Sequence, residues 1–152
     1  DRVADLLIEE GGEFFHGYTY SGHPVAAAVG LENLRILREE GIVDRVRNET
    51  APYLQEKIAG LIEHPLVGEV RGVGLLGALE LVSDKASRAR FAGDGRAGGL
   101  CRDICVRNGL VMRAVGDTMI MSPPLVISRS EVDQLVERIW RCLDLTAIAL
   151  KE

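Results

Sequence analysis

Four short apolar stretches in the second half of the chain come in two pairs, and this pairing limits the possible folds. The first pair covers residues 66–70 and 73–82, and the second covers residues 110–113 and 118–121. A Gly116-Asp117 turn joins the second pair as a hairpin. Strands that come in pairs, instead of alternating singly with helices, predict an α+β fold. We expect a short, largely antiparallel sheet with helices on one face.

Apolar residues at helical spacing predict helices on either side of these strand pairs. We expect the tail of a helix over residues 1–9, an irregular stretch over 13–20, and helices over 25–40, 43–63, 100–107 and about 131–145. Pro52 implies a break or a kink near Thr50-Ala51. Ser128 or Ser130 caps the last helix. The first half of the 25–40 helix is apolar nearly all round, so we expect a neighbour to bury it.

Composition excludes several classes of protein. The chain has 152 residues, 47% of them hydrophobic, which is too apolar for intrinsic disorder. Its net charge is −5, which argues against nucleic-acid and membrane-surface partners. No apolar run approaches the roughly 18 residues that a membrane span needs. Residues 1–8 carry two aspartates and lack the basic region of a signal peptide.

The cysteines predict a reducing compartment, which we take to be the cytoplasm. There are three, and an odd number favours buried free thiols. Cys101 and Cys105 are four residues apart with no histidine nearby, and this is a poor zinc site because tetrahedral sites want four ligands. We therefore predict no metal site.

Residues 72–77 match the pattern G-x-G-x-x-G, which in a dinucleotide-binding turn opens a helix. Here the following residues, 78–82, read as a strand, and no complete βαβ unit surrounds the motif. We therefore interpret the glycines as part of a strand that packs closely against another backbone.

Other catalytic patterns are also missing. No serine has G-x-S-x-G around it, and the three histidines lack the H-E-x-x-H spacing. His64 precedes Pro65 in a predicted turn, where we expect its side chain to be solvated.

The segment His16–Ala28 places several hydroxyl groups directly before a predicted helix. Two interpretations remain open from the residues alone. The hydroxyls can cap the helix, or they can help to bind an anion, because unpaired N–H groups and the helix dipole point toward that place.

The same segment resembles the T-Y-S-G-H-P signature of class III aminotransferases, which are pyridoxal 5'-phosphate enzymes of fold type I. The resemblance continues nearly to the end of the chain, and the details are most similar to the polyamine–pyruvate ω-aminotransferases. It is carried by residues 71–77 (R-G-x-G), by residues 101–103 and 108–117 (ending M-R-A-V-G-D), and by residues 122–128 (S-P-P-L).

This resemblance implies a domain organisation and three site residues. Residues 1–40 would be an arm and a connecting helix from a large domain, and residues 41–152 the small C-terminal domain. Tyr18 and Thr19 would bind the cofactor phosphate of a neighbouring subunit, which implies a homodimer or a higher homo-oligomer. Arg113 would bind the carboxylate of the amino acceptor and swing aside for amine substrates. A planar guanidinium suits a carboxylate.

The resemblance also implies that part of the enzyme lies elsewhere. In the family, the lysine that binds the cofactor covalently lies upstream of T-Y-S-G-H-P. The lysines here are Lys57, Lys85 and Lys151, all downstream of it. We therefore expect no catalytic residue in this chain and no activity from the chain alone.

Two main hypotheses about function follow. In the first, the chain is the C-terminal part of an enzyme that moves an amino group from a putrescine-like amine or an ω-amino acid to pyruvate. In the second, it is a non-catalytic small-domain module that acts in dimerisation or partner binding. A nucleotide-binding oxidoreductase is a third and weaker alternative, because it depends on the glycine pattern of residues 72–77.

Overall fold

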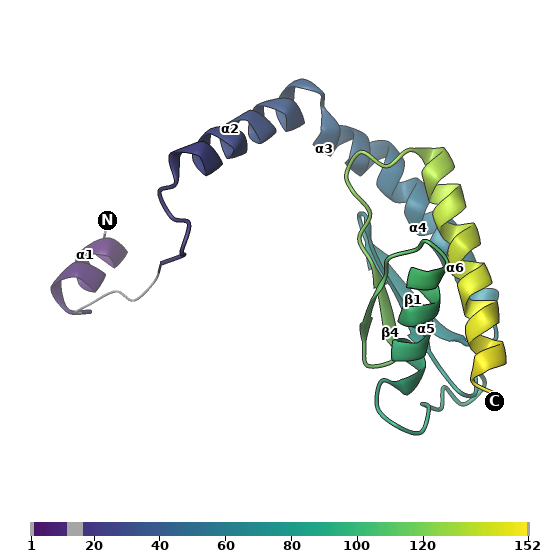
Figure 1. The fold of residues 1–152 in the computed structure, drawn as a ribbon. Helices are drawn as coiled ribbons and strands as arrows, with labels where there is room; N and C mark the ends of the chain where they lie inside the picture. Colours follow the sequence, from purple (N-terminus) through teal and green to yellow (C-terminus); the bar gives the residue numbers. More distant parts are fainter. Residues whose placement is uncertain (1, 12–16, 152) are drawn as a thin grey trace. The chain divides into compact units, whose positions relative to one another are not determined.

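The computed structural model describes residues 2–11 and 17–151, and the chain divides into two compact units, residues 1–39 and 40–152 (Figure 1). Each unit is described by itself. Within the described residues, no helix is long and apolar enough to cross a membrane.

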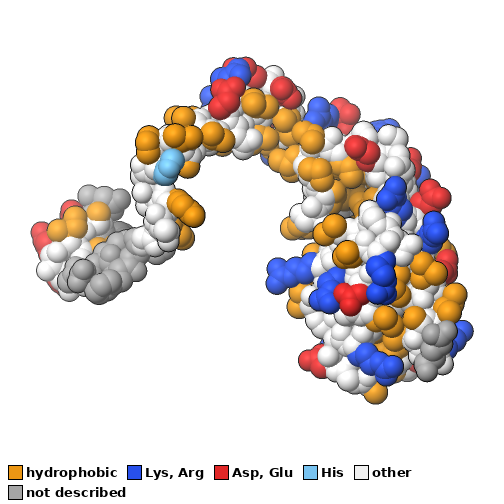
Figure 2. Space-filling model, viewed as in Figure 1, with side chains coloured by type: hydrophobic (Ala, Val, Ile, Leu, Met, Phe, Trp, Pro, Cys, Tyr) orange, Lys and Arg blue, Asp and Glu red, His pale blue; other side chains and the backbone are white. Residues whose placement is uncertain are grey.

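The first unit contains helices α1 (Arg2–Glu9) and α2 (Pro24–Glu39). Part of the predicted irregular stretch, residues 12–16, lies outside the described residues. Contrary to the sequence prediction, no residue of α2 is buried. Its exposed apolar side chains include Val25, Val29, Leu31 and Leu34. Figure 2 shows apolar side chains at the surface along α2.

The second unit begins with one continuous helical segment. It comprises α3 (Ile42–Arg45), the π-helical η1 (Val46–Thr50), α4 (Ala51–Ala59) and the 3-10 helix η2 (Gly60–Glu63). The predicted irregularity at Thr50-Ala51 is present, but as a widened turn and not as a break. Pro52 has no N–H to continue the α-helical ladder, and the N–H of Ala51 donates to the carbonyl of Val46.

The sheet contains four antiparallel strands in the order β1-β2-β4-β3. They are β1 (Val67–Val73), β2 (Leu76–Leu81), β3 (Arg113–Val115) and β4 (Thr118–Met121). The bounds of the first three strands differ from the prediction. The first hairpin turns at Gly74-Leu75, where Gly74 has φ +61°, and not at residues 71–72. The third strand begins at Arg113 and not at Leu110.

Helices α4, α5 (Arg96–Arg107) and α6 (Arg129–Ala149) cover one face of this sheet (Figure 1). The core lies between them and includes Leu54, Ile58, Leu79, Met119, Ile139 and Leu143. This arrangement confirms the α+β prediction.

His64 is not solvated as predicted, because its side chain is only 1% exposed. Its Nδ1 accepts a hydrogen bond from the Leu66 N–H at 3.1 Å, and its Nε2 lies 3.2 Å from Asp144 Oδ1. The ring of Trp140 meets it edge to face, with 5.2 Å between centroids. The turn at Pro65 therefore folds the imidazole inward against α6.

The predicted buried free thiols are confirmed: Cys101, Cys105 and Cys142 are all buried and unbridged. Burial raises the pKa of the Cys142 thiol. Such a thiol stays protonated and packs as a small apolar group.

Candidate functional site

The sheet face that α4, α5 and α6 leave uncovered carries an ordered array of side chains. The strand register places Arg71, Ala78, Ile120 and Arg113 in one row across all four strands. A second row contains Glu69, Glu80, Thr118 and Val115. We call this surface the open face. It places an arginine at each end of the first row, on the two edge strands.

The two arginines of the first row differ in their partners. Arg71 Nη1 lies 3.1 Å from Glu80 Oε2 and 3.4 Å from Glu69 Oε1, so two carboxylates occupy its guanidinium. Arg88 adds a further contact to Glu69 at 3.7 Å. Arg113 is exposed, and within residues 2–11 and 17–151 its guanidinium makes no hydrogen bond or ion pair. Its five N–H donors are therefore available to an incoming carboxylate.

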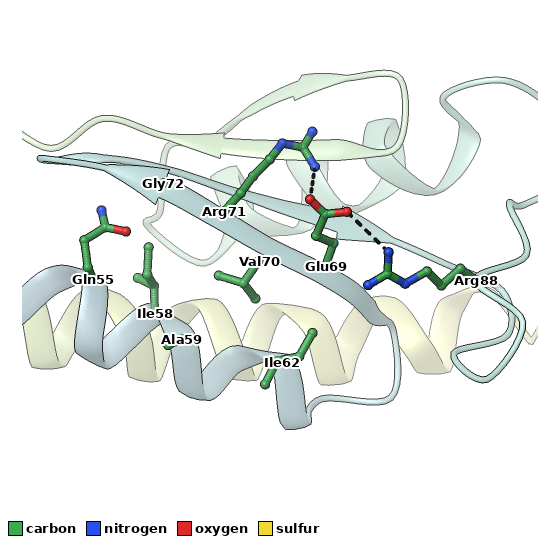
Figure 3. Close-up of a pocket in the computed structure, with 9 residues that line it drawn as sticks. All are labelled: Gln55, Ile58, Ala59, Ile62, Glu69, Val70, Arg71, Gly72 and Arg88. Carbon is green, nitrogen blue, oxygen red and sulfur yellow. Dashed lines mark hydrogen bonds and ion pairs between the residues drawn. The ribbon is translucent and has the colours of Figure 1, made fainter.

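A groove lies between α4 and the outer edge of β1, as Figure 3 shows. Ile58, Ile62 and Val70 line its apolar part, whereas Arg71 and Glu69 point away from the helix. The charged groups at this groove are paired with one another. The groove therefore differs in character from the surface around Arg113.

The G-x-G-x-x-G pattern forms the β1–β2 hairpin and opens no helix, so the structure confirms that it is not a dinucleotide turn. A Cβ on Gly72 would lie 2.5 Å from the Leu76 carbonyl oxygen. Gln55 closes the turn, because its Nε2 donates to the Gly74 carbonyl at 2.9 Å and to the Leu76 carbonyl at 3.1 Å. The glycines are therefore explained by close packing and by a turn.

Tyr18 and Thr19 lie in a tight turn before α2. The Ser21 N–H donates to the Tyr18 carbonyl at 2.9 Å, and the Tyr18 N–H donates to Ser21 Oγ at 3.2 Å. In the described part of the chain, no hydrogen bond occupies the Thr19 hydroxyl or the N–H groups of Thr19 and Tyr20. These exposed donors fit one end of a phosphate group.

The start of α2 itself offers less to an anion. Pro24 has no N–H, and the Ala26 N–H is capped by His23 Nδ1 at 3.3 Å. The cap of α2 is therefore the His23 imidazole and not a hydroxyl as in the first interpretation, and anion binding at the turn that precedes the helix stays a prediction.

Two of the three lysines form an ion pair or hydrogen bonds with other groups of the chain. Lys57 Nζ lies 3.2 Å from Asp133 Oδ1, and that carboxylate, with Tyr53, raises the pKa of Lys57. Lys85 donates to the carbonyls of Ile62 and His64. A lysine that attacks a carbonyl group needs a neutral amine, so these environments are unsuited to binding pyridoxal phosphate covalently.

Sequence reasoning missed one contact near Arg113. The β3–β4 turn is anchored to α5, because the Gly98 N–H donates to Asp117 Oδ1 at 2.8 Å. The contact joins residues nineteen apart, and the available sequence signal was an aspartate directly after the glycine of a hairpin turn.

A known enzyme family contains the same elements: the open face of the sheet, the helices behind it and the hydroxyl-bearing turn before α2. Residues 2–143 match the model of the class III aminotransferases, and the chain belongs to this family. It corresponds to the C-terminal part of a fold type I enzyme.

Comparison with individual relatives shows which members of the family the chain is similar to. It is 61% identical over 150 residues to a putrescine–pyruvate aminotransferase of Pseudomonas aeruginosa, covering 99% of this chain and 32% of that protein. It is 39% identical over 154 residues to the mitochondrial gamma aminobutyrate transaminase 1 of Solanum lycopersicum, covering 99% of this chain and 30% of that protein. The chain thus spans about a third of the length of the curated relatives that it matches.

Solved structures share the same fold. The omega transaminase of Pseudomonas jessenii in complex with PMP superposes with a TM-score of 0.81 at 42% identity, covering 95% of this chain and 31% of that one. A transaminase with L-ala gives a TM-score of 0.84 at 39% identity, covering 97% and 34%.

Proposed function

We propose that the protein to which this chain belongs transfers an amino group from a putrescine-like amine or an ω-amino acid to pyruvate, using pyridoxal phosphate. The observation that carries the proposal is Arg113, a guanidinium on the open face that no described residue pairs with, in contrast to Arg71 in the same row. The likeness to a putrescine–pyruvate aminotransferase supports the choice of substrates.

This chain supplies binding groups, while the lysine that holds the cofactor comes from elsewhere in the protein. In the turn formed by Tyr18 and Thr19, the hydroxyl of Thr19 and the N–H groups of Thr19 and Tyr20 would donate to the cofactor phosphate. When bound, pyridoxal phosphate would supply an electron sink and would also carry the amino group from the donor to the acceptor. Arg113 binds the carboxylate of pyruvate and orients its keto carbon.

A diamine and a keto acid must use the same pocket in turn. Arg113 has no partner among the described residues that would fix its side chain against the protein, so it can leave the pocket when a cationic amine enters. The uncovered apolar surface of α2 supports a homodimer, in which the turn at Thr19 serves the neighbouring subunit.

The test of the proposal is Arg113→Ala in the intact enzyme. A hydrogen bond to a charged group contributes about 1.5–3 kcal/mol, so the apparent KM for pyruvate should rise roughly 10- to 150-fold. The half-reaction with an amine that lacks a carboxylate should change far less. Arg113→Lys should restore only part of the loss, because it keeps the charge without the planar fork.

Stopped-flow measurement of the two half-reactions separates this role from a structural one. Arg71→Ala is the matched control, since Arg71 lies in the same row of the sheet but is already paired with Glu80 and Glu69. Equal losses in both half-reactions of Arg113→Ala would mean that Arg113 has a structural role, and another arginine would have to bind the carboxylate.

A further inference from the structure

The hairpin that carries Arg113 is held by the pairing of β4 with β2 and by contacts with α5. Strand β3 has three residues, lies at the edge of the sheet, and pairs only with β4. The position of Arg113 therefore depends on the β3–β4 turn, Gly116-Asp117, which immediately follows the strand.

This turn caps α5. The helix begins after Gly95, which has no side chain to cap it. The Asp117 carboxylate takes that role by accepting a hydrogen bond from the N–H of Gly98 in the first turn of the helix at 2.8 Å. A carboxylate at a helix N-terminus is favourable both as a hydrogen-bond acceptor and in the field of the helix dipole.

The backbones of the turn and the helix also touch. A Cβ built on Gly98 would lie 2.1 Å from the carbonyl oxygen of Gly116 and 3.0 Å from Cα of Asp117. On the other side, the Leu81 N–H of β2 donates to the Asp117 carbonyl at 3.0 Å. The turn is thus fixed between α5 and β2, and only a glycine at position 98 allows this approach.

We propose that Gly98 and Asp117 are positioning residues for Arg113: their contact sets where the β3–β4 hairpin presents the guanidinium to a carboxylate substrate. The inference rests on the proposed function of Arg113 and extends it to two residues that do not lie on the open face. A side chain at position 98 would push the turn, and β3 with it, away from α5.

The test compares two neighbouring glycines of α5 in the intact enzyme. Gly98→Ala introduces the clash with Gly116, whereas a Cβ on Gly99 meets nothing within 4 Å. Both changes add the same methyl group to the same helix. Because a misplacement of about 1 Å in a binding group can cost about 100-fold, we expect Gly98→Ala to raise the apparent KM for pyruvate by about tenfold or more. Gly99→Ala should leave it unchanged.

A second pair of variants tests the hydrogen bond. Asp117→Ala removes the acceptor and should weaken pyruvate use, whereas Asp117→Asn retains an amide oxygen that can accept from Gly98 and should restore most of it. If Gly98→Ala does not fold, this pair decides the question. The half-reaction with an amine that lacks a carboxylate should stay near the wild-type rate in every variant.

Three results would overturn the proposal: equal effects of Gly98→Ala and Gly99→Ala, equal losses in both half-reactions, or an Asp117→Asn enzyme as impaired as Asp117→Ala. In an Arg113→Ala background, Gly98→Ala should add no further loss, because both act on one interaction. If Arg113→Ala alone leaves pyruvate use intact, the proposed function fails. If Arg113→Ala impairs pyruvate use and Gly98→Ala does not, only the positioning inference fails.

Discussion

Thr19 offers a hydroxyl that no described residue occupies, in a turn that is closed by other groups. In the intact enzyme, Thr19→Ala should raise the Kd for pyridoxal phosphate by about tenfold or more, because it removes a hydrogen bond to a charged phosphate. Equilibrium dialysis would measure the affinity. Thr19→Ser keeps the hydroxyl and should bind nearly as well as the wild type. Unchanged affinity in Thr19→Ala would argue against the assignment.

His64 holds the end of η2 against α6 through a buried ring. His64→Ala would leave the Leu66 N–H unpaired and create a cavity beside Trp140, so it should lower the free energy of unfolding by about 2–4 kcal/mol. The chain has a single tryptophan, so the fluorescence of Trp140 in a urea titration reports on this unit. His23→Ala, which lies in the other unit, is the control and should not move the transition. A wild-type midpoint for His64→Ala would contradict this role.

At the scale of elements, α6 begins with a capping box. The Ser128 N–H and hydroxyl donate to Glu131 Oε2, each at 2.7 Å, and Ser128 Oγ accepts from the Glu131 N–H at 3.3 Å. The backbone N–H of Ser128, and then its hydroxyl, lower the pKa of Glu131. The folded state therefore binds the proton more weakly than the unfolded state. The resulting stabilisation is present above the unfolded pKa and is lost as the pH falls through the folded pKa.

Glu131→Gln keeps an acceptor for Ser128 but cannot titrate. Between about pH 6 and about pH 3, the urea midpoint of the wild type should fall further than that of Glu131→Gln, because carboxyl groups titrate in this range. Ser128→Ala should lower stability at every pH by about 0.5–2 kcal/mol, as for other N-cap residues. Identical pH profiles for the wild type and Glu131→Gln would show that the capping carboxylate has no influence on stability.

The elements of this fold follow from local patterns to different degrees. The cap of α6 and the Gly116-Asp117 turn are local in sequence: the cap was predicted at Ser128 or Ser130 and lies at Ser128, and the turn was predicted at the right residues. The ends of β1 and β3 were misplaced, because where a strand stops depends on its partner's register and on side chains such as Gln55. The apolar periodicity of a single segment carries no information about the register of its partner strand or about contacts with side chains such as Gln55.

The candidate site also combines features that local sequence predicts with features that only the folded structure shows. The motif led to Arg113, but the contrast between Arg71, which is paired with Glu80 and Glu69, and Arg113, whose guanidinium has no partner among the described residues, is visible only in the structure. The inward position of His64 and the contact between Gly98 and Asp117 join residues far apart in the sequence, by 80 and 19 positions. No local pattern encodes such contacts.

At the scale of the whole molecule, the 152 residues alone should not transaminate. Lys57 is paired with Asp133, Lys85 donates to backbone carbonyls, and all three lysines, Lys151 included, lie downstream of T-Y-S-G-H-P, whereas the family's covalent lysine lies upstream of it. The purified chain should retain no cofactor absorbance after dialysis against buffer and form no alanine from pyruvate and putrescine. The intact enzyme in the same assay is the control. Turnover that rises with the concentration of the chain, and that disappears in Lys57→Ala or Lys85→Ala, would contradict the prediction.

The alternation along β3 and β4 has a consequence for how such a protein can change. Ala114, Met119 and Met121 face the helices and carry the packing, while Arg113, Val115 and Ile120 face the other way. Substitutions at Val115 and Ile120 should therefore leave the core unchanged and yield mostly folded proteins, whereas Arg113 must be kept if its guanidinium binds the acceptor as proposed. In the proposed enzyme, selection can thus alter the surface beside Arg113 at these two positions without loss of the fold.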